Sequence, residues 1–202
     1  MGNYEYIISS LPALTLDWKY SEGSSFGSYV AWVKSQLGES DIKKLDILLQ
    51  GYDNSNLNRE FYEAALKDGN RFLREFFTFD LNVRNAKARF LNKAFGRPAD
   101  MDTIKIETGE FSEAAALEEI LSRTDILERE HGLDSLTWEK IDRITTFNYF
   151  DLDAVLGFIA RLHIIDRWFS LDEETGRDLF KKLVFDLHDT ARNLSYVPPK
   201  DE

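Results

Sequence analysis

The chain of 202 residues contains no cysteine. This absence excludes disulfides, cysteine-based zinc sites and a cysteine nucleophile, and it fits a reducing compartment. Only four prolines are present, and two of them lie near the end of the sequence, which favours long uninterrupted helices. No apolar run approaches the length of about 18 residues that a membrane-spanning helix needs. The first residues have no signal-peptide pattern, so we expect a cytoplasmic location.

Motifs of catalysis and of nucleotide binding are also missing. The sequence has neither a Walker loop nor a dinucleotide fingerprint, and its three histidines accompany no nucleophile motif. The formal net charge of −11 argues against general nucleic-acid binding, because phosphate recognition needs a basic surface. We therefore expect no catalytic site, no cofactor and no nucleic-acid partner.

Apolar residues at helical spacing dominate what is present, and 43% of all residues are hydrophobic. We expect an all-α fold, a helical bundle or array, with a short strand or extended segment at 4–9. A single helical domain is expected over 1–195, with possible sub-units 1–97 and 98–195, and a disordered tail over 196–202. The spacing predicts helices over about 26–37, 40–49, 124–131, 135–146 and 152–169, one from about 112, and a last one from 170.

The longest apolar pattern begins near Tyr62 and holds its helical spacing through Phe77. No proline interrupts it before Pro98, so one very long central helix of almost forty residues is expected. A break near Thr78–Asp80 is the alternative. The segment 152–169 has apolar residues on several sides, which predicts a central, buried helix. Ser170 and Glu173 have the spacing of a capping box, which predicts the start of the last helix.

A basic segment runs against the acidic character of the chain. No carboxylate occurs from Leu81 to Ala99, and cations on this expected helix include three at i, i+4 and i+8. These cations are the candidate partner-binding residues: Arg84, Lys87, Arg89, Lys93 and Arg97. One interpretation is a docking surface for an acidic partner. The other is a solvated face that pairs internally with the acidic segment 107–130.

Two pairs of residues have spacings that occur in metal sites or in acid–base pairs on helices. Glu128 and His131 have the spacing of a helical di-iron site, but such a site needs a second motif of this kind, so a solvated helix end is the expected interpretation. His163 and Asp166 lie three apart on an apolar helix, where a structural contact is expected. Asp186 and His188 are two apart and face different sides of a helix. We predict no metal site.

Two segments carry a resemblance to known proteins. The opening Asn3–Leu14 places an aromatic residue and an apolar pair before Ser-Leu-Pro, and Phe79–Arg89 contains an Asp followed closely by Asn, an apolar residue and a cation. In the first segment the chain resembles an uncharacterised bacterial family encoded among the genes of archaeal/vacuolar-type rotary ATPases, and the second segment is similar to the pattern of the C subunit of these ATPases. That family is distantly similar to the C subunit of these ATPases, which is called d in the eukaryotic enzyme.

The resemblance implies a non-catalytic coupling part of a V-type ATPase, with a fold like that of the C subunit. The C subunit is a helical funnel that sits on the membrane rotor ring and receives the central shaft, so the shaft and ring subunits are the implied partners. Association with the membrane, and with ion or proton transport, would come only through those partners. The alternative is a free-standing cytoplasmic helical adaptor that binds an acidic protein.

Overall fold

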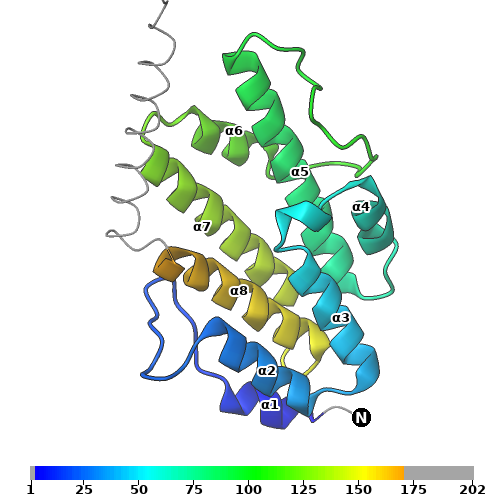
Figure 1. Cartoon of the computed structure of the whole chain (residues 1–202), viewed down its shortest axis with the longest axis vertical. Helices are drawn as coiled ribbons and strands as arrows, with labels where there is room; N and C mark the ends of the chain where they lie inside the picture. The colour runs from blue at the N-terminus through cyan, green and yellow to red at the C-terminus, as the bar shows by residue number, and fades with distance from the viewer. Residues whose placement is uncertain (1–2, 171–202) are drawn as a thin grey trace, which may run out of the picture.

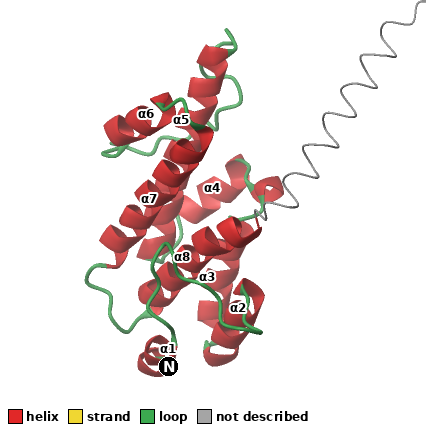
Figure 2. Cartoon of the chain, turned by 90° about the vertical axis from the view of Figure 1, so that its left-hand side faces the viewer, coloured by secondary structure: helices red, strands yellow, loops and turns green. Residues whose placement is uncertain are grey.

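A computed structural model describes residues 3–170, and all regular secondary structure in this part of the chain is helical, without a strand. Figure 1 and Figure 2 show the helices from two sides. Within residues 3–170, eight α-helices and one 3₁₀ turn follow in this order: α1 Tyr4–Ser10, α2 Phe26–Gln36, α3 Glu39–Gln50, η1 Asn54–Asn56, α4 Arg59–Leu66, α5 Arg71–Ala94, α6 Ala114–Ser122, α7 Ile126–Thr145 and α8 Leu152–Ser170. The all-α prediction is confirmed. Within 3–170, no helix is both long and apolar enough to cross a membrane.

The N-terminal segment differs from its prediction. Residues 4–10 form helix α1 instead of a strand or extended segment. The side chain of Asn3 accepts a hydrogen bond from the backbone N–H of Tyr6, which caps the first turn. Ile7 is completely buried against the core. A local cap and tertiary burial thus outweigh the strand preference of the β-branched and aromatic residues.

The expected helix of almost forty residues is divided into α4 and α5. The break lies at residues 67–70, not near Thr78–Asp80, where α5 is continuous. Asn70 caps α5 by accepting a hydrogen bond from Leu73 N at 2.9 Å. Asp68 accepts one from Asn70 N at 2.7 Å and also binds Lys44 of α3. These local bonds redirect the chain although the apolar spacing continues across the break.

Helix α7 differs in the opposite sense, because one helix replaces the two that were expected. Gly132, predicted to end the first of them, lies buried inside α7. A Cβ built on Gly132 would lie 2.9 Å from Cγ2 of Ile120 in α6. The glycine therefore allows α6 and α7 to approach closely and does not terminate a helix.

The buried side chains form two clusters. The larger one surrounds α8, which packs against α1, α2, α3, α5 and α7. Val155, Leu156 and Ile159 of α8 have no exposed surface, so the prediction of a central, buried helix over 152–169 is confirmed. The smaller cluster joins α5, α6 and α7 through Phe79, Leu117, Ile120, Leu121, Leu133 and Leu136. The expected last helix and the tail lie outside the described residues.

Candidate functional site: a charged groove and an exposed aromatic loop

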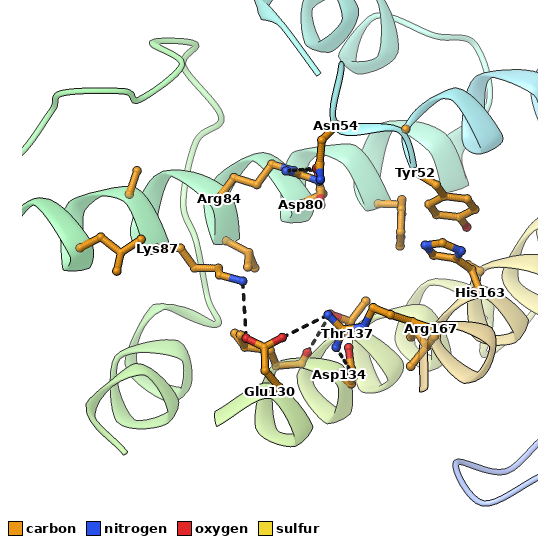
Figure 3. A pocket seen from close by; sticks show the side chains of 18 residues that line it. Tyr52, Asn54, Asp80, Arg84, Lys87, Glu130, Asp134, Thr137, His163 and Arg167 are labelled. Atoms are coloured by element: carbon orange, nitrogen blue, oxygen red, sulfur yellow. Dashed lines mark hydrogen bonds and ion pairs between the residues drawn. The ribbon is translucent and has the colours of Figure 1, made fainter. Parts of the chain in front are cut away.

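A groove lies between α5 and α7, and we call it the α5–α7 groove (Figure 3). Residues of α8 and of the turn after α3 complete its lining, and its volume is about 570 Å³. Its walls are apolar in part and also carry cations and carboxylates. The lining residues are Gly51, Tyr52, Asn54, Phe76, Asp80, Val83, Arg84, Lys87, Ala88, Leu91, Glu130, Leu133, Asp134, Thr137, Ala160, His163, Ile164 and Arg167.

A chain of ion pairs crosses this groove. Glu130 of α7 lies 4.0 Å from the Lys87 ammonium of α5 and 3.1 Å from the Arg167 guanidinium of α8. Arg167 also binds Asp134, which accepts a second hydrogen bond from Trp168 Nε1 at 2.7 Å. The side chains of Lys87 and Glu130 are 42% and 33% exposed, so solvent weakens this pair to at most about 1 kcal/mol. The Lys87–Glu130 pair therefore orients α5 and α7 more than it stabilises them.

Asp80 organises the other end of the groove. It accepts hydrogen bonds from the Tyr62 hydroxyl of α4 and from Arg84 Nε, the latter at 2.8 Å. Arg84 also donates to Asn54, as Figure 3 shows. Burial, and then the negative charge of Asp80, raise the pKa of Tyr62 far above its usual value. Tyr62 therefore stays a neutral donor, and Asp80 joins α4 to α5.

Asparagines of the basic segment attach the loop 98–110 to α5. Asn85 accepts a hydrogen bond from Ile104 N and donates one to Ile104 O, both at 2.9 Å. Asn82 accepts one from Thr108, and Asn92 donates to the carbonyl oxygens of Ala99 and Met101. This role was not predicted from the sequence. Its signal was the spacing of three asparagines at i, i+3 and i+10, which places them on one face of α5.

The basic segment divides into paired and unpaired cations. Arg84 pairs with Asp80 and Arg89 with Asp100, and neither carboxylate belongs to the segment 107–130. Among the described ion pairs, Lys87 alone of the five cations reaches that segment, at Glu130. Lys93 and Arg97 are exposed and form no ion pair within residues 3–170. The guanidinium of Arg97 lies 5.5 Å from the ring centroid of Phe95.

The two histidine candidates pack against aromatic rings. His131 stacks on Trp168 at 4.1 Å between ring centroids, and His163 stacks on Tyr52 at 3.7 Å. Burial lowers the pKa of His163 to about 4. Asp166 accepts a hydrogen bond from Tyr20 at 3.0 Å. Within residues 3–170, no group of three or more histidine, aspartate or glutamate side chains is arranged so that it could hold a metal ion. Asp186 and His188 lie outside the described residues.

A second feature is the loop between α7 and α8, which exposes three aromatic side chains. Phe147, Tyr149 and Phe150 are 85%, 68% and 55% exposed, and we call this segment the aromatic loop. It was not predicted from the sequence. Its signal was three aromatics within four residues of a short connection that also contains an asparagine.

Polar residues hold the aromatic loop in place. Arg71 of α5 donates to the carbonyl oxygen of Ile144 and, at 2.8 Å, to Asn148 Oδ1. Asn148 in turn donates to Asp151, whose other oxygen accepts a hydrogen bond from Ala154 N at 3.0 Å. The polar side chain thus points inward and is bonded while the aromatic ones point to solvent. This reversal of the usual pattern indicates a surface for association.

Comparison with known proteins gives one match. A family model with the description "Protein of unknown function (DUF2764)" matches residues 106–191. The matched part contains α6, α7 and α8 and continues beyond the described residues. No curated protein and no solved structure matches the chain. To that extent, the chain is similar to a family whose function is not established.

Proposed function

We propose that the chain is a non-catalytic subunit or accessory factor of a V/A-type rotary ATPase, which couples the central shaft to the membrane rotor ring as the C subunit does. The resemblance of Asn3–Leu14 to the family encoded with these ATPases, and of Phe79–Arg89 to the C-subunit pattern, motivates the proposal. In the structure, Asp80 and the asparagines of the second segment hold α4 and the loop 98–110 on α5. The residues of the second segment therefore have a structural role, because they hold α4 and the loop 98–110 against α5.

The aromatic loop is the observation that carries the proposal. Three aromatic side chains with these exposures present roughly 400 Å² of mostly apolar surface, given the area that such side chains bury. Aromatic residues dominate binding energy when they enter a partner's pocket, and a surface held in place loses little conformational entropy on binding. The aromatic loop thus suits permanent attachment to another protein of the complex.

The two clusters explain how such a part transmits force. Helix α5 contributes Phe72 and Phe76 to the larger cluster and Phe79 to the smaller one. Helix α7 likewise contributes Ile141 to the larger and Leu136 to the smaller. Two long helices thus connect both clusters, and a load applied at the aromatic loop reaches the far end of α5 through packed side chains.

Purification of the tagged protein from native membranes tests the proposal. We expect shaft and rotor-ring subunits to co-purify, and we expect the triple substitution Phe147→Ala, Tyr149→Ala and Phe150→Ala to abolish their recovery. The matched control is Ile126→Ala with Leu127→Ala, because these exposed apolar residues lie at the other end of α7. Recovery of neither shaft nor ring with the unsubstituted chain would contradict the proposal and favour a free-standing adaptor.

A further inference from the structure

A second pocket lies beside the aromatic loop, and we call it the α1–α8 pocket. Helix α1 and the loop after it form one side, and the end of α7 and the first half of α8 form the other, around a volume of about 400 Å³. Tyr149 of the aromatic loop lines it, and Arg161 is the only charged residue within 3–170 that does so. The large apolar residues of the lining include Ile8, Leu11, Leu14 and Phe158. The pocket therefore offers one cation among apolar walls.

The guanidinium of Arg161 is held in place, but several of its donors lack an acceptor. Its Nη2 donates to Thr145 Oγ1 at 3.0 Å and lies 2.8 Å from Asp142 Oδ1, and its Cζ lies 5.8 Å from the ring centroid of Trp138. Its Nε is buried without a hydrogen-bond partner, and its Nη1 forms no hydrogen bond within residues 3–170. The donors on Nε and Nη1 are thus unused. A carboxylate is the acceptor whose geometry matches this planar group.

The loop after α1 also has unused polar groups in its backbone. Residues 12–15 have no regular secondary structure, and the backbone of Ala13 and Leu14 forms no hydrogen bond within residues 3–170. Both residues line the pocket, and Ala13 is exposed. An extended peptide laid along this loop would exchange backbone hydrogen bonds with it, as peptides do at a free strand edge. An acyl chain in the same place would cover these groups without bonding them, which costs free energy.

We propose that the α1–α8 pocket binds the C-terminal residue of a partner protein, with an apolar side chain against Leu14 and Phe158 and the carboxylate on Arg161. The last residue of a chain carries its side chain and a carboxylate on one α-carbon, which matches a single cation among apolar walls. A volume of about 400 Å³ is near the lower end of the range for ligand pockets, about 300–1,000 Å³, so it suits one residue and its neighbour. Capture of a C-terminal carboxylate is a recurring mode of peptide recognition.

The pocket and the aromatic loop share Tyr149, so a partner bound in the pocket also reaches that loop. The inference deepens the proposed function by giving the chemistry of what attaches there, and it rests on that function only for the attachment of a partner at this surface. Binding of peptides without co-purification of shaft and ring subunits would support the pocket and contradict the ATPase assignment. Co-purification without binding of peptides would do the reverse.

Fluorescence anisotropy with the purified full-length chain tests the inference. The probes are peptides of the sequence Gly-Ser-Gly-Ser-Ala-X with a dye on the N-terminus, where X is Leu, Ile, Val or Phe, each made as the free acid and as the C-terminal amide. We expect at least one free acid to bind at least about tenfold more tightly than its amide, because the amide lacks the charge that Arg161 recognises. Free acids that bind no better than their amides, or no binding of any peptide up to about 1 mM, would overturn the proposal.

Substitutions assign the effect to the pocket. Arg161→Gln should remove the difference between free acid and amide, whereas the control Arg59→Gln, on the surface of α4 and paired with Glu63, should retain it. Asp142→Asn should tighten binding of the free acid by about twofold to fivefold, because it removes a carboxylate that competes for Arg161. Circular dichroism shows whether each variant keeps its helices. A difference between acid and amide that persisted in Arg161→Gln would place the carboxylate elsewhere and overturn the proposal.

A second variant leaves Arg161 in place and also identifies other occupants. Ala154 lines the pocket, so Ala154→Leu should fill it and abolish binding of every peptide. Unchanged binding would overturn the proposal. Dodecanoate that bound more tightly than every peptide would identify an acyl ligand. Self-association that Ala154→Leu abolished and the peptides did not reverse would show a second copy in the pocket. Either of these two results would also overturn the proposal.

Discussion

The ring of Phe77 lies directly against the α-carbon of Gly51. A Cβ built on Gly51 would fall 2.5 Å from Phe77 Cζ, and Phe77 is only 1% exposed. Phe77 also contacts Phe61 and Phe76 edge to face, with ring centroids 5.0 Å and 5.4 Å away. The backbone of Gly51 is in the ordinary helical region, so the glycine is required by this close packing and not by its conformation.

We predict that Gly51→Ala destabilises the protein by about 1–3 kcal/mol, which is the usual cost of overpacking a core. The melting temperature in thermal unfolding measures this effect. Gly69→Ala is the control, because nothing lies within 4 Å of a Cβ at that position. If the two variants melted at the same temperature, the close contact between Gly51 and Phe77 would be wrong.

Alkaline conditions should weaken the attachment of α1. Burial raises the pKa of Tyr4 to about 12, and the hydrogen bond that Tyr4 donates to Asp41 at 2.7 Å adds to this effect. Because the folded-state pKa exceeds the unfolded value near 10, this contribution is complete below pH 10 and is lost as the pH rises toward 12. Chemical denaturation at several pH values should show a smaller alkaline loss for Tyr4→Phe. An identical pH dependence in both proteins would contradict this assignment.

His163 should cause a loss of stability in acid. Burial lowers its pKa to about 4, below the usual value of 6.5. The unfolded chain therefore binds more protons between these values, so the stability that the neutral imidazole contributes falls as the pH decreases from about 6.5 to about 4. We expect His163→Phe to reduce the slope of unfolding free energy against pH in this window. An unchanged slope would show that His163 is accessible to protons in the folded protein.

Charge reversal on the exposed side of the basic segment should leave the fold intact. Lys93 is exposed, and the side chains of the Arg89–Asp100 pair are 54% and 59% exposed. Arg89→Glu with Lys93→Glu should therefore change the unfolding free energy by no more than about 0.5 kcal/mol for each residue. Circular dichroism and denaturant titration measure this. Loss of the helical signal would identify these cations as internal struts.

Much of the helical framework was predictable from apolar spacing. Capping and stop residues gave α2 and α3 to within one residue, and the apolar content of 152–169 indicated its burial. Two expectations about helix ends were wrong. The break before Asn70 depends on a side-chain cap, and the continuity of α7 at Gly132 depends on the neighbouring Ile120. The side-chain cap is a local hydrogen bond that competes with helix continuation, and the glycine packing is a tertiary contact. The spacing of hydrophobic residues contains information about neither.

The candidate site was less predictable. The cations of the basic segment could be identified, but Asp80 and Asp100, which pair with two of them, lie outside the acidic segment expected to do so. Asp80 lies four residues before Arg84 on α5, a spacing that is visible in the sequence, whereas only the fold shows that the loop after α5 brings Asp100 to Arg89. The aromatic loop was missed because a hydrophobic residue in a connection is normally assigned to the core, and only the structure shows it exposed.

The sharing of α5 and α7 between two clusters also determines how the protein unfolds. If the smaller cluster opened alone, it would release the middle of α5 and the first half of α7. The other turns of these two helices place Phe72, Phe76 and Ile141 in the larger cluster, so that cluster would be disturbed as well. The described part of the chain should therefore lose its structure in one cooperative transition, with amide protons of Leu136 and Ile141 exchanging at the same global rate.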